Sequence, residues 1–231
     1  MILAIDSSTA WLGLALYEES AVLYERVWKT HKRHTVELAP AVEKALLDCA
    51  LSIEQIKALA IAKGPGSFTS LRIGLVFIKG LALAYHLPVI GIPTLDILAY
   101  SQPIRNLPLI CALQAGRGKL AVASYKNVDN HWKCDTPIQV LTAKELILQI
   151  LTPTLVSGEF TEEDRHTFSR KWKSVILATP ANCVRRPSCL AELTFQLWKA
   201  GKIDDPVTMT PIYLHTSDPI LSFPEYSISG R

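Results

Sequence analysis

Residues 1–28, MILAIDSSTAWLGLALYEESAVLYERVW, decide the fold of this chain. The apolar run at 1–5 predicts a short strand that ends in the polar turn 6–9. A second strand is expected at 12–17 and, after another turn, a third at 21–28. Three short strands joined by tight turns are typical of an antiparallel meander at one end of a mixed sheet.

The stretch that follows alternates helices and strands. We expect a helix at 35–51, a strand at 57–62, a helix from 67 or 69 to 86, a strand at 89–92 and a helix at 94–101. The first helix is amphipathic, whereas the second is apolar nearly all round. A helix of that kind is covered on more than one side, so another helix of this chain or a partner must lie on it.

The order of elements then starts again. After a proline-containing crossing at 102–108, strands are expected at 109–113, 120–126 and around 136–141, then a helix at 143–151, a strand near 154–156, a helix at 188–200 and a short strand at 211–214. The repeated order predicts an α/β protein with two lobes of similar topology, divided as 1–104 and 105–231.

The composition is that of a globular protein, with 49% hydrophobic and 19% charged residues. The net charge of +3 permits contact with nucleic acid but does not demand it. Five cysteines without a CxxC pair indicate free thiols in a reducing compartment and argue against a zinc site. No signal peptide is visible, and Lys79 interrupts the most apolar segment, so we expect a cytoplasmic protein that spans no membrane.

Two turns carry groups that can bind phosphate. The polar turn that begins with Asp6 and Ser7 can face a phosphate and its Mg²⁺, or it can be an Asx turn that closes a hairpin. The stretch GPGSFT that begins at Gly64 precedes a helix, where free N–H groups bind anions, but it also suits a rigid corner between strand and helix.

Three basic stretches are candidate contacts for nucleic acid. The stretch HKRH at 31–34 can contact nucleic acid, hold a metal through its two histidines, or be a solvated loop. The pairs of basic residues around Trp172 and at 185–186 are equally compatible with an ordinary surface. The sequence contains no HExxH motif and no Ser-His-Asp arrangement that spacing supports, so a protease has no support.

These pieces together resemble the bacterial TsaB (YeaZ) family. The matching stretches are ILAIDSST at 2–9, HT at 34–35, GPGSFTSLRIG at 64–74, KGLA at 79–82, PVIGI at 88–92, TL at 94–95 and, near the end, PIYL at 211–214. The likeness is close over residues 1 to about 100 and thin beyond.

The resemblance implies an actin-like ATPase fold of the ribonuclease H-like type. TsaB proteins pair with the catalytic paralogue TsaD. Together with the ATPase TsaE they attach threonylcarbamoyl from threonylcarbamoyl-AMP to N6 of the adenosine beside the anticodon of tRNA. TsaB itself is regarded as non-catalytic. The resemblance therefore implies a dimerisation subunit that is not an enzyme on its own, forms a homodimer when alone and meets tRNA indirectly.

The resemblance also suggests sites. The partner interface is expected on the two helices of the first lobe, at Leu38, Val42, Leu46, Arg72, Phe77 and Leu81. If a nucleotide such as ATP or ADP with Mg²⁺ binds, its phosphates are expected at Asp6, Ser7, Gly64, Gly66 and Ser67. We expect no catalytic residue and no metal site built from protein ligands alone.

The chain departs from the family pattern in its second lobe. Gln114 and Lys119 each replace an acid, and His215 replaces an arginine. An active kinase or ATPase of the same superfamily, with Mg²⁺ held by Asp6, is the main alternative, and Gln114 argues against it because such an enzyme needs acids at both lobe entrances. An independent RNA-binding protein is a further alternative, disfavoured by the weak net charge.

Overall fold

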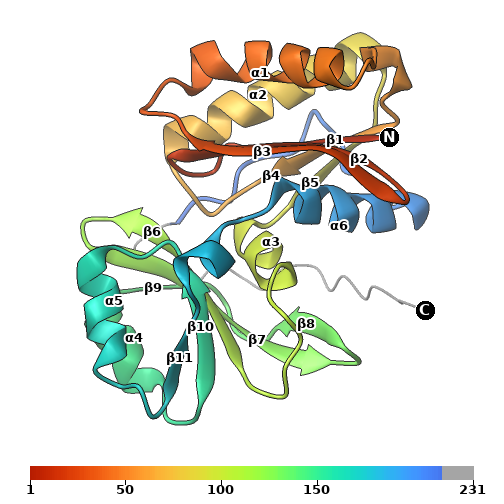
Figure 1. The fold of residues 1–231 in the computed structure, drawn as a ribbon. Coiled ribbons are helices and arrows are strands. Elements are labelled where there is room, and N and C mark those ends of the chain that lie inside the picture. Colours follow the sequence, from red (N-terminus) through yellow and green to blue (C-terminus); the bar gives the residue numbers. More distant parts are fainter. Residues whose placement is uncertain (215–231) are drawn as a thin grey trace. The chain divides into compact units, whose positions relative to one another are not determined.

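The computed structural model describes residues 1–214, which form two compact units (Figure 1). Unit 1 comprises Met1–Ile97 and Arg186–Tyr213, and unit 2 comprises Leu98–Arg185. The boundary between them falls within helix α3 (Thr94–Tyr100).

Unit 1 is built on a five-stranded sheet of order β3-β2-β1-β4-β5. Its strands are β1 (Ile2–Asp6), β2 (Trp11–Glu18), β3 (Ala21–Lys29), β4 (Ala58–Ala62) and β5 (Val89–Ile92). The first three form the predicted antiparallel meander, and β4 and β5 run parallel to β1. β1 and β4 are buried along their whole length, which explains their uninterrupted apolar sequences.

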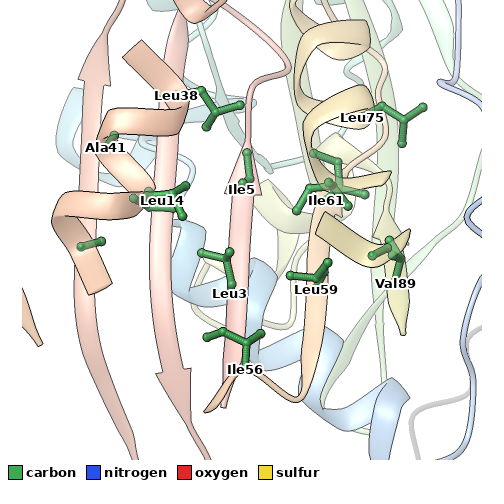
Figure 2. Close-up of a cluster of buried hydrophobic side chains, with 14 of the residues drawn as sticks. Leu3, Ile5, Leu14, Leu38, Ala41, Ile56, Leu59, Ile61, Leu75 and Val89 are labelled. Carbon is green, nitrogen blue, oxygen red and sulfur yellow. The ribbon is translucent and has the colours of Figure 1, made fainter. Parts of the chain in front are cut away.

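Helices cover both faces of this sheet. The helices of unit 1 are α1 (His34–Asp48), the short 3₁₀ helix η1 (Ile53–Gln55), α2 (Phe68–Tyr85) and α6 (Pro187–Lys199). Figure 1 shows α1 and α2 side by side on one face and α6 on the other. Figure 2 shows the core between the sheet and the α1–α2 layer, where strand residues such as Ile5 and Leu14 meet Leu38 and Leu75 of the helices.

Unit 2 contains a second sheet of order β11-β10-β6-β7-β8, with β9 paired to β7. Its strands are β6 (Leu109–Gly116), β7 (Lys119–Val128), β8 (His131–Cys134), β9 (Gln139–Leu141), β10 (Thr154–Gly158) and β11 (Val175–Leu177). Its helical segments are α4 (Ala143–Gln149), α5 (Glu162–Ser169) and the 3₁₀ helix η2 (Pro180–Cys183). The helices cover a core around the fully buried ring of Phe168.

The two sheets have the same topology. In each, three consecutive strands form an antiparallel meander, and two later strands extend the sheet in parallel from the first strand. This is the duplicated ribonuclease H-like arrangement of actin-like ATPases. The predicted fold class is therefore confirmed.

The structure divides the chain differently from the sequence-based boundary. Residues after 104 were all expected in the second lobe, but α6 belongs to unit 1, where it packs against β1, β2 and β4. The physical reason is its buried stripe, which includes Leu190, Leu193 and Leu197. The sequence predicted this helix but could not show which sheet it would cover.

Some elements of the second half also differ from expectation. The third strand of the second meander is β8, whereas the strand expected around 136–141 is the short β9 that pairs with β7 instead. Residues 211–214 form no strand, although the N–H of Ile212 donates to the carbonyl of Lys63 at 2.7 Å. The segment 160–190, which the sequence left without an assignment, contains α5, β11 and η2.

Candidate functional site

The turn after β1 carries the acidic residue that the sequence analysis singled out. Asp6 is buried at the end of β1. Its Oδ1 atom accepts hydrogen bonds from the backbone N–H and the hydroxyl of Ser8, at 2.9 and 2.5 Å. This is the Asx-turn arrangement, in which the carboxylate satisfies polar groups of its own turn.

The glycine-rich corner between β4 and α2 lies directly against this turn. The N–H of Ser67 donates to the carbonyl of Ser8 at 2.7 Å, and a Cβ atom on Gly66 would lie only 2.1 Å from that same oxygen. The hydroxyl of Ser7 donates to the carbonyl of Ser70 at 2.9 Å. The two predicted segments therefore come together, and glycine is required because the two backbones touch.

Gly64 makes a separate close approach, to the last described segment of unit 1. Its φ of 107° is a left-handed conformation, and a Cβ there would lie 2.5 Å from the carbonyl oxygen of Ile212. Its N–H donates to the hydroxyl of Thr94 at 3.1 Å. Gly64 thus allows this corner to contact Thr94 and Ile212, which are far from it in the sequence.

These contacts bear on nucleotide binding. The N–H groups of Gly64 and Ser67 are donated within the protein, and Oδ1 of Asp6 is engaged by Ser8. Within residues 1–214 no group of three His, Cys, Asp or Glu side chains is placed to hold a metal ion. The turn and the corner are therefore held together by hydrogen bonds within the protein, and a nucleotide contact at these residues stays a prediction.

Gln114 stands in unit 2 at the place that corresponds to the end of β1 in unit 1, near the end of β6. Its amide nitrogen donates to the carbonyl of Glu159 at 3.1 Å and to Oδ2 of Asp164 at 2.9 Å. Asp164 also caps α5 through Thr161. An amide is suited to this position, because a carboxylate there would face a second carboxylate and a carbonyl oxygen.

The other two residues that depart from the family pattern are Lys119 and His215. Lys119 is exposed at the start of β7. His215 lies outside the described residues.

The six residues expected at a partner interface do not share one surface. Leu38 and Val42 are 2% and 5% exposed and belong to the core under α1, which corrects the expectation that they lie at a partner interface. The reason is that their stripe of the helix faces the sheet. Leu46, Phe77 and Leu81 are partly buried at the margin of that core.

Arg72 is exposed near the start of α2. Its guanidinium lies over the ring of Phe68, 3.7 Å from the centroid, and its Nε donates to the hydroxyl of Tyr213 at 2.9 Å. Lys79 donates to the carbonyl of Val207 at 3.2 Å. The segment that follows α6 is therefore attached along α2 by two cations of that helix.

The outer surface of α1 and α2 carries large exposed apolar side chains that were not among the expected interface residues. Val36 and Leu47 of α1 are 58% and 71% exposed, and Val76 and Leu83 of α2 are 70% and 63% exposed. We call these four residues the outer apolar stripe. Their spacing within each helix is the signal that could have identified them, because Val76 and Leu83 lie about two turns apart and Val36 and Leu47 about three, so each pair shares a face of its helix.

α2 is the one helix within residues 1–214 whose length and composition would allow it to cross a membrane, with a mean hydropathy of 1.4 over 18 residues. Such a finding is weak, because helices that cover a sheet pass the same test. Leu75, Ile78 and Ala82 of α2 pack into the core of unit 1.

Comparisons with known proteins agree on one family. The model of a family described as TsaD, tRNA N6-adenosine threonylcarbamoyltransferase, matches residues 28–178. The tRNA threonylcarbamoyladenosine biosynthesis protein TsaB of Bacillus subtilis (strain 168) is 40% identical over 98 residues, which are 42% of this chain and 43% of the relative. The protein of the same name from Escherichia coli (strain K12) is 35% identical over 131 residues, 56% of each chain.

A solved structure shows the same fold. The crystal structure of an uncharacterized protein from Pseudomonas aeruginosa with similarity to peptidase YEAZ superposes with a TM-score of 0.76. It is 21% identical, and the alignment covers 93% of this chain and 99% of that one. In sequence, by contrast, the chain spans about half the length of the curated relatives it matches.

Proposed function

This chain belongs to the TsaB (YeaZ) family, and from that membership we propose that it is a non-catalytic pairing subunit in tRNA threonylcarbamoyladenosine synthesis. Its partner is a TsaD-type catalytic paralogue. The complex, which also recruits a TsaE-type ATPase, transfers threonylcarbamoyl from threonylcarbamoyl-AMP to N6 of the adenosine beside the anticodon. In the absence of TsaD the chain forms a homodimer. The complex modifies tRNA in the cytoplasm.

The outer apolar stripe is the observation that carries this proposal. Four large apolar side chains, Val36, Leu47, Val76 and Leu83, are each more than half exposed on two adjacent helices. Large apolar side chains that are exposed on neighbouring helices are typical of sites of protein association. A partner that lays two helices of its own on α1 and α2 would remove these side chains from water.

The absence of catalysis is supported by the two lobe positions where an actin-like ATPase needs acids. In unit 1, Asp6 is engaged with Ser8, and in unit 2 the corresponding place is taken by Gln114. An amide carries no charge with which to hold Mg²⁺. These contacts favour a supporting role over the kinase or ATPase alternative.

The test is the molar mass in light scattering of the purified chain, alone and mixed with TsaD of the same organism. We expect a homodimer that is replaced by a one-to-one heterodimer. The double variant Val76→Glu/Leu83→Glu is expected to remain folded, because both side chains are already exposed, and to lose pairing by at least 100-fold, since two buried carboxylates without partners are costly.

Leu151→Glu is the matched control. Leu151 is 82% exposed, belongs to unit 2 and is not part of the outer apolar stripe, so the same change there should leave pairing intact. Circular dichroism of each variant reports folding separately. A monomer that ignores TsaD, or a Val76→Glu/Leu83→Glu variant that pairs like the wild type, would contradict the proposal.

A further inference from the structure

A basic loop joins β3 to α1 beside an exposed tryptophan. Lys29, His31, Lys32 and Arg33 lie within five consecutive positions, and all four are exposed. Trp11, at the start of β2, is 43% exposed. Cations around an accessible aromatic ring form a recognised pattern for contact with single-stranded nucleic acid.

The loop is held in place by the turn between β1 and β2. The buried Thr30 donates its N–H to the carbonyl of Ala10 at 2.9 Å, and its hydroxyl accepts the N–H of Arg33 at 3.0 Å. The buried ring of His34 makes a hydrogen bond of 2.9 Å between Nε2 and the carbonyl oxygen of Thr9. His34 is therefore a structural anchor. Because His34 is buried and engaged in this way, the structure does not favour a metal ion held jointly by His31 and His34.

The register of the strands places Trp11 and Lys29 together. They are directly opposite each other in the antiparallel pair of β2 and β3, so they lie on the same face of the sheet with neighbouring Cβ atoms. Glu25, four residues before Lys29, lies on that face too and holds Arg186 at the start of α6. The surface thus continues from the loop toward a third cation.

Acidic neighbours neutralise only part of this charge. Glu37 pairs with Arg33 at 3.6 Å, and Glu25 pairs with Arg186. In the part of the chain that the structure describes, neither Lys29 nor Lys32 has a carboxylate partner. Within residues 1–214, the positive charges of Lys29, which is opposite Trp11, and of Lys32 in the loop are therefore not neutralised by a carboxylate.

We propose that Trp11, Lys29 and Lys32 form a direct contact surface for RNA. The lysines bind phosphates of a single-stranded segment, and a base stacks on the indole of Trp11. That the RNA is the tRNA substrate rests on the proposed function. The chain then contributes to holding the substrate as well as to pairing. An anionic membrane fits the surface less well, because membrane adsorption needs an apolar face to insert, and here one aromatic ring stands among cations.

The experiment measures fluorescence anisotropy of a labelled, unmodified tRNA transcript that carries adenosine beside its anticodon. The chain is titrated alone and as its mixture with TsaD. We expect Lys29→Glu/Lys32→Glu to weaken binding about 10-fold or more, and to reduce the slope of log K against log salt by roughly 1.5, as expected for two lost phosphate contacts. Trp11→Ala should weaken binding roughly 10-fold and leave that slope unchanged, because stacking releases no counterions.

Unit 2 supplies matched controls. Trp172 is 72% exposed with Lys173 near its ring, 5.6 Å from the centroid, and Lys144 is exposed on α4. Trp172→Ala and Lys144→Glu/Lys173→Glu repeat the same chemical changes at residues that are not part of the proposed surface. They should change the affinity less than twofold.

Four outcomes would overturn the proposal. They are wild-type affinity in the Trp11 and lysine variants, equal losses in the unit 2 controls, no contribution of the chain to tRNA binding alone or with TsaD, and binding to phosphatidylserine vesicles but not to tRNA. Light scattering separates this result from the pairing proposal, because the lysine variants should still form the heterodimer. Pairing without RNA contact would refute this surface alone, and RNA contact without pairing would refute the proposed function alone.

Discussion

The glycines of this chain show how much a single Cβ atom can decide. Gly66→Ala would put a methyl carbon 2.1 Å from the carbonyl oxygen of Ser8, so one of two backbone segments must move. We expect a loss of unfolding free energy of about 2 kcal/mol or more, as for other overpacked sites. Thermal unfolding followed by circular dichroism measures it.

Gly80→Ala is the matched control for that substitution. Gly80 lies within α2, and a Cβ there has nothing within 4 Å. Alanine should raise the stability by about 0.5–1 kcal/mol, because glycine is the poorer helix former. If both variants changed the melting temperature in the same direction, the close contact between the turn and the corner would not be present in solution.

Cys189 offers a second test at the scale of the residue. Burial raises the pKa of its thiol to about 11, against an ordinary value near 8.5. At pH 8 about a thousandth of such a thiol is ionised, whereas roughly a quarter of an ordinary thiol is. Because the thiolate is the nucleophile, iodoacetamide should label Cys189 about 100-fold more slowly in the native protein than in urea, as read by peptide mass spectrometry. Equal rates in both would show that the helix exposes this thiol.

At the scale of the element, α6 is joined to β3 through one carboxylate. Glu25 accepts hydrogen bonds from the N–H of Ser188 at 3.0 Å and from Nε of Arg186 at 3.1 Å. Burial raises the pKa of Glu25, but the hydrogen bonds from Arg186 and Ser188 outweigh it and hold the pKa below its ordinary value of 4.5. A lowered carboxyl pKa means that the ionised form is favoured by folding.

The pH dependence follows from that sign. The contribution of Glu25 is fully present above pH 4.5 and is lost as the pH falls through its lower folded pKa. Glu25→Gln should therefore cost about 1 kcal/mol of unfolding free energy at pH 7, and the difference from wild type should shrink below pH 4. Urea unfolding at both pH values measures it. Glu19→Gln, at a 71% exposed side chain, should stay within about 0.5 kcal/mol, and a Glu25→Gln cost that did not change with pH would refute the assignment.

The elements of unit 1 were predictable because their sequence signals are local. The meander is bounded by polar turns, and α2 ends where His86 takes a left-handed conformation just before Pro88. Much of unit 2 was not predictable. α5 is short and mostly polar, and β11 has three residues, so neither gives a hydrophobic period long enough to detect. The packing of α6 on the first sheet depends on contacts far apart in sequence, such as that of Glu25 with Ser188.

The candidate site was predictable in position but not in its contacts. The family resemblance suggested Asp6 and Gly66 for one nucleotide site, and the structure brings their segments together because they follow the neighbouring parallel strands β1 and β4. Only the three-dimensional structure shows that Ser8 donates hydrogen bonds to Asp6. It also shows that the glycines allow two backbone segments to touch. Likewise, helical spacing groups Leu38 and Val36 with their own stripes of α1, but only the structure shows which stripe faces the sheet.

At the scale of the whole molecule, the duplicated topology makes Gln114 the counterpart of Asp6, and the two lobes have diverged there. If unit 2 has adapted to the amide of Gln114, an acid at this position, as in the family pattern, should lower the stability of the protein. Gln114 now donates a hydrogen bond of 2.9 Å to Asp164, and Gln114→Asp would replace this donor by a second, shorter carboxylate that faces the first. Neighbouring like charges raise a carboxyl pKa, so the penalty, about 1–2 kcal/mol, should be present at pH 7 and should fall as the pH drops and one acid is protonated.

The double variant Gln114→Asp/Asp164→Asn tests the cause of that penalty. Asparagine can still accept at the helix cap through its carbonyl oxygen and can donate to the new carboxylate, so stability at pH 7 should return to within about 0.5 kcal/mol of wild type.

Phosphate release from ATP should stay at background in the wild type and in both variants, with Asp6→Ala as the reference. Recovery of hydrolysis in Gln114→Asp that is lost again on adding Asp6→Ala would show that a nucleotide site persists across the fold, and the non-catalytic role would then have to be abandoned.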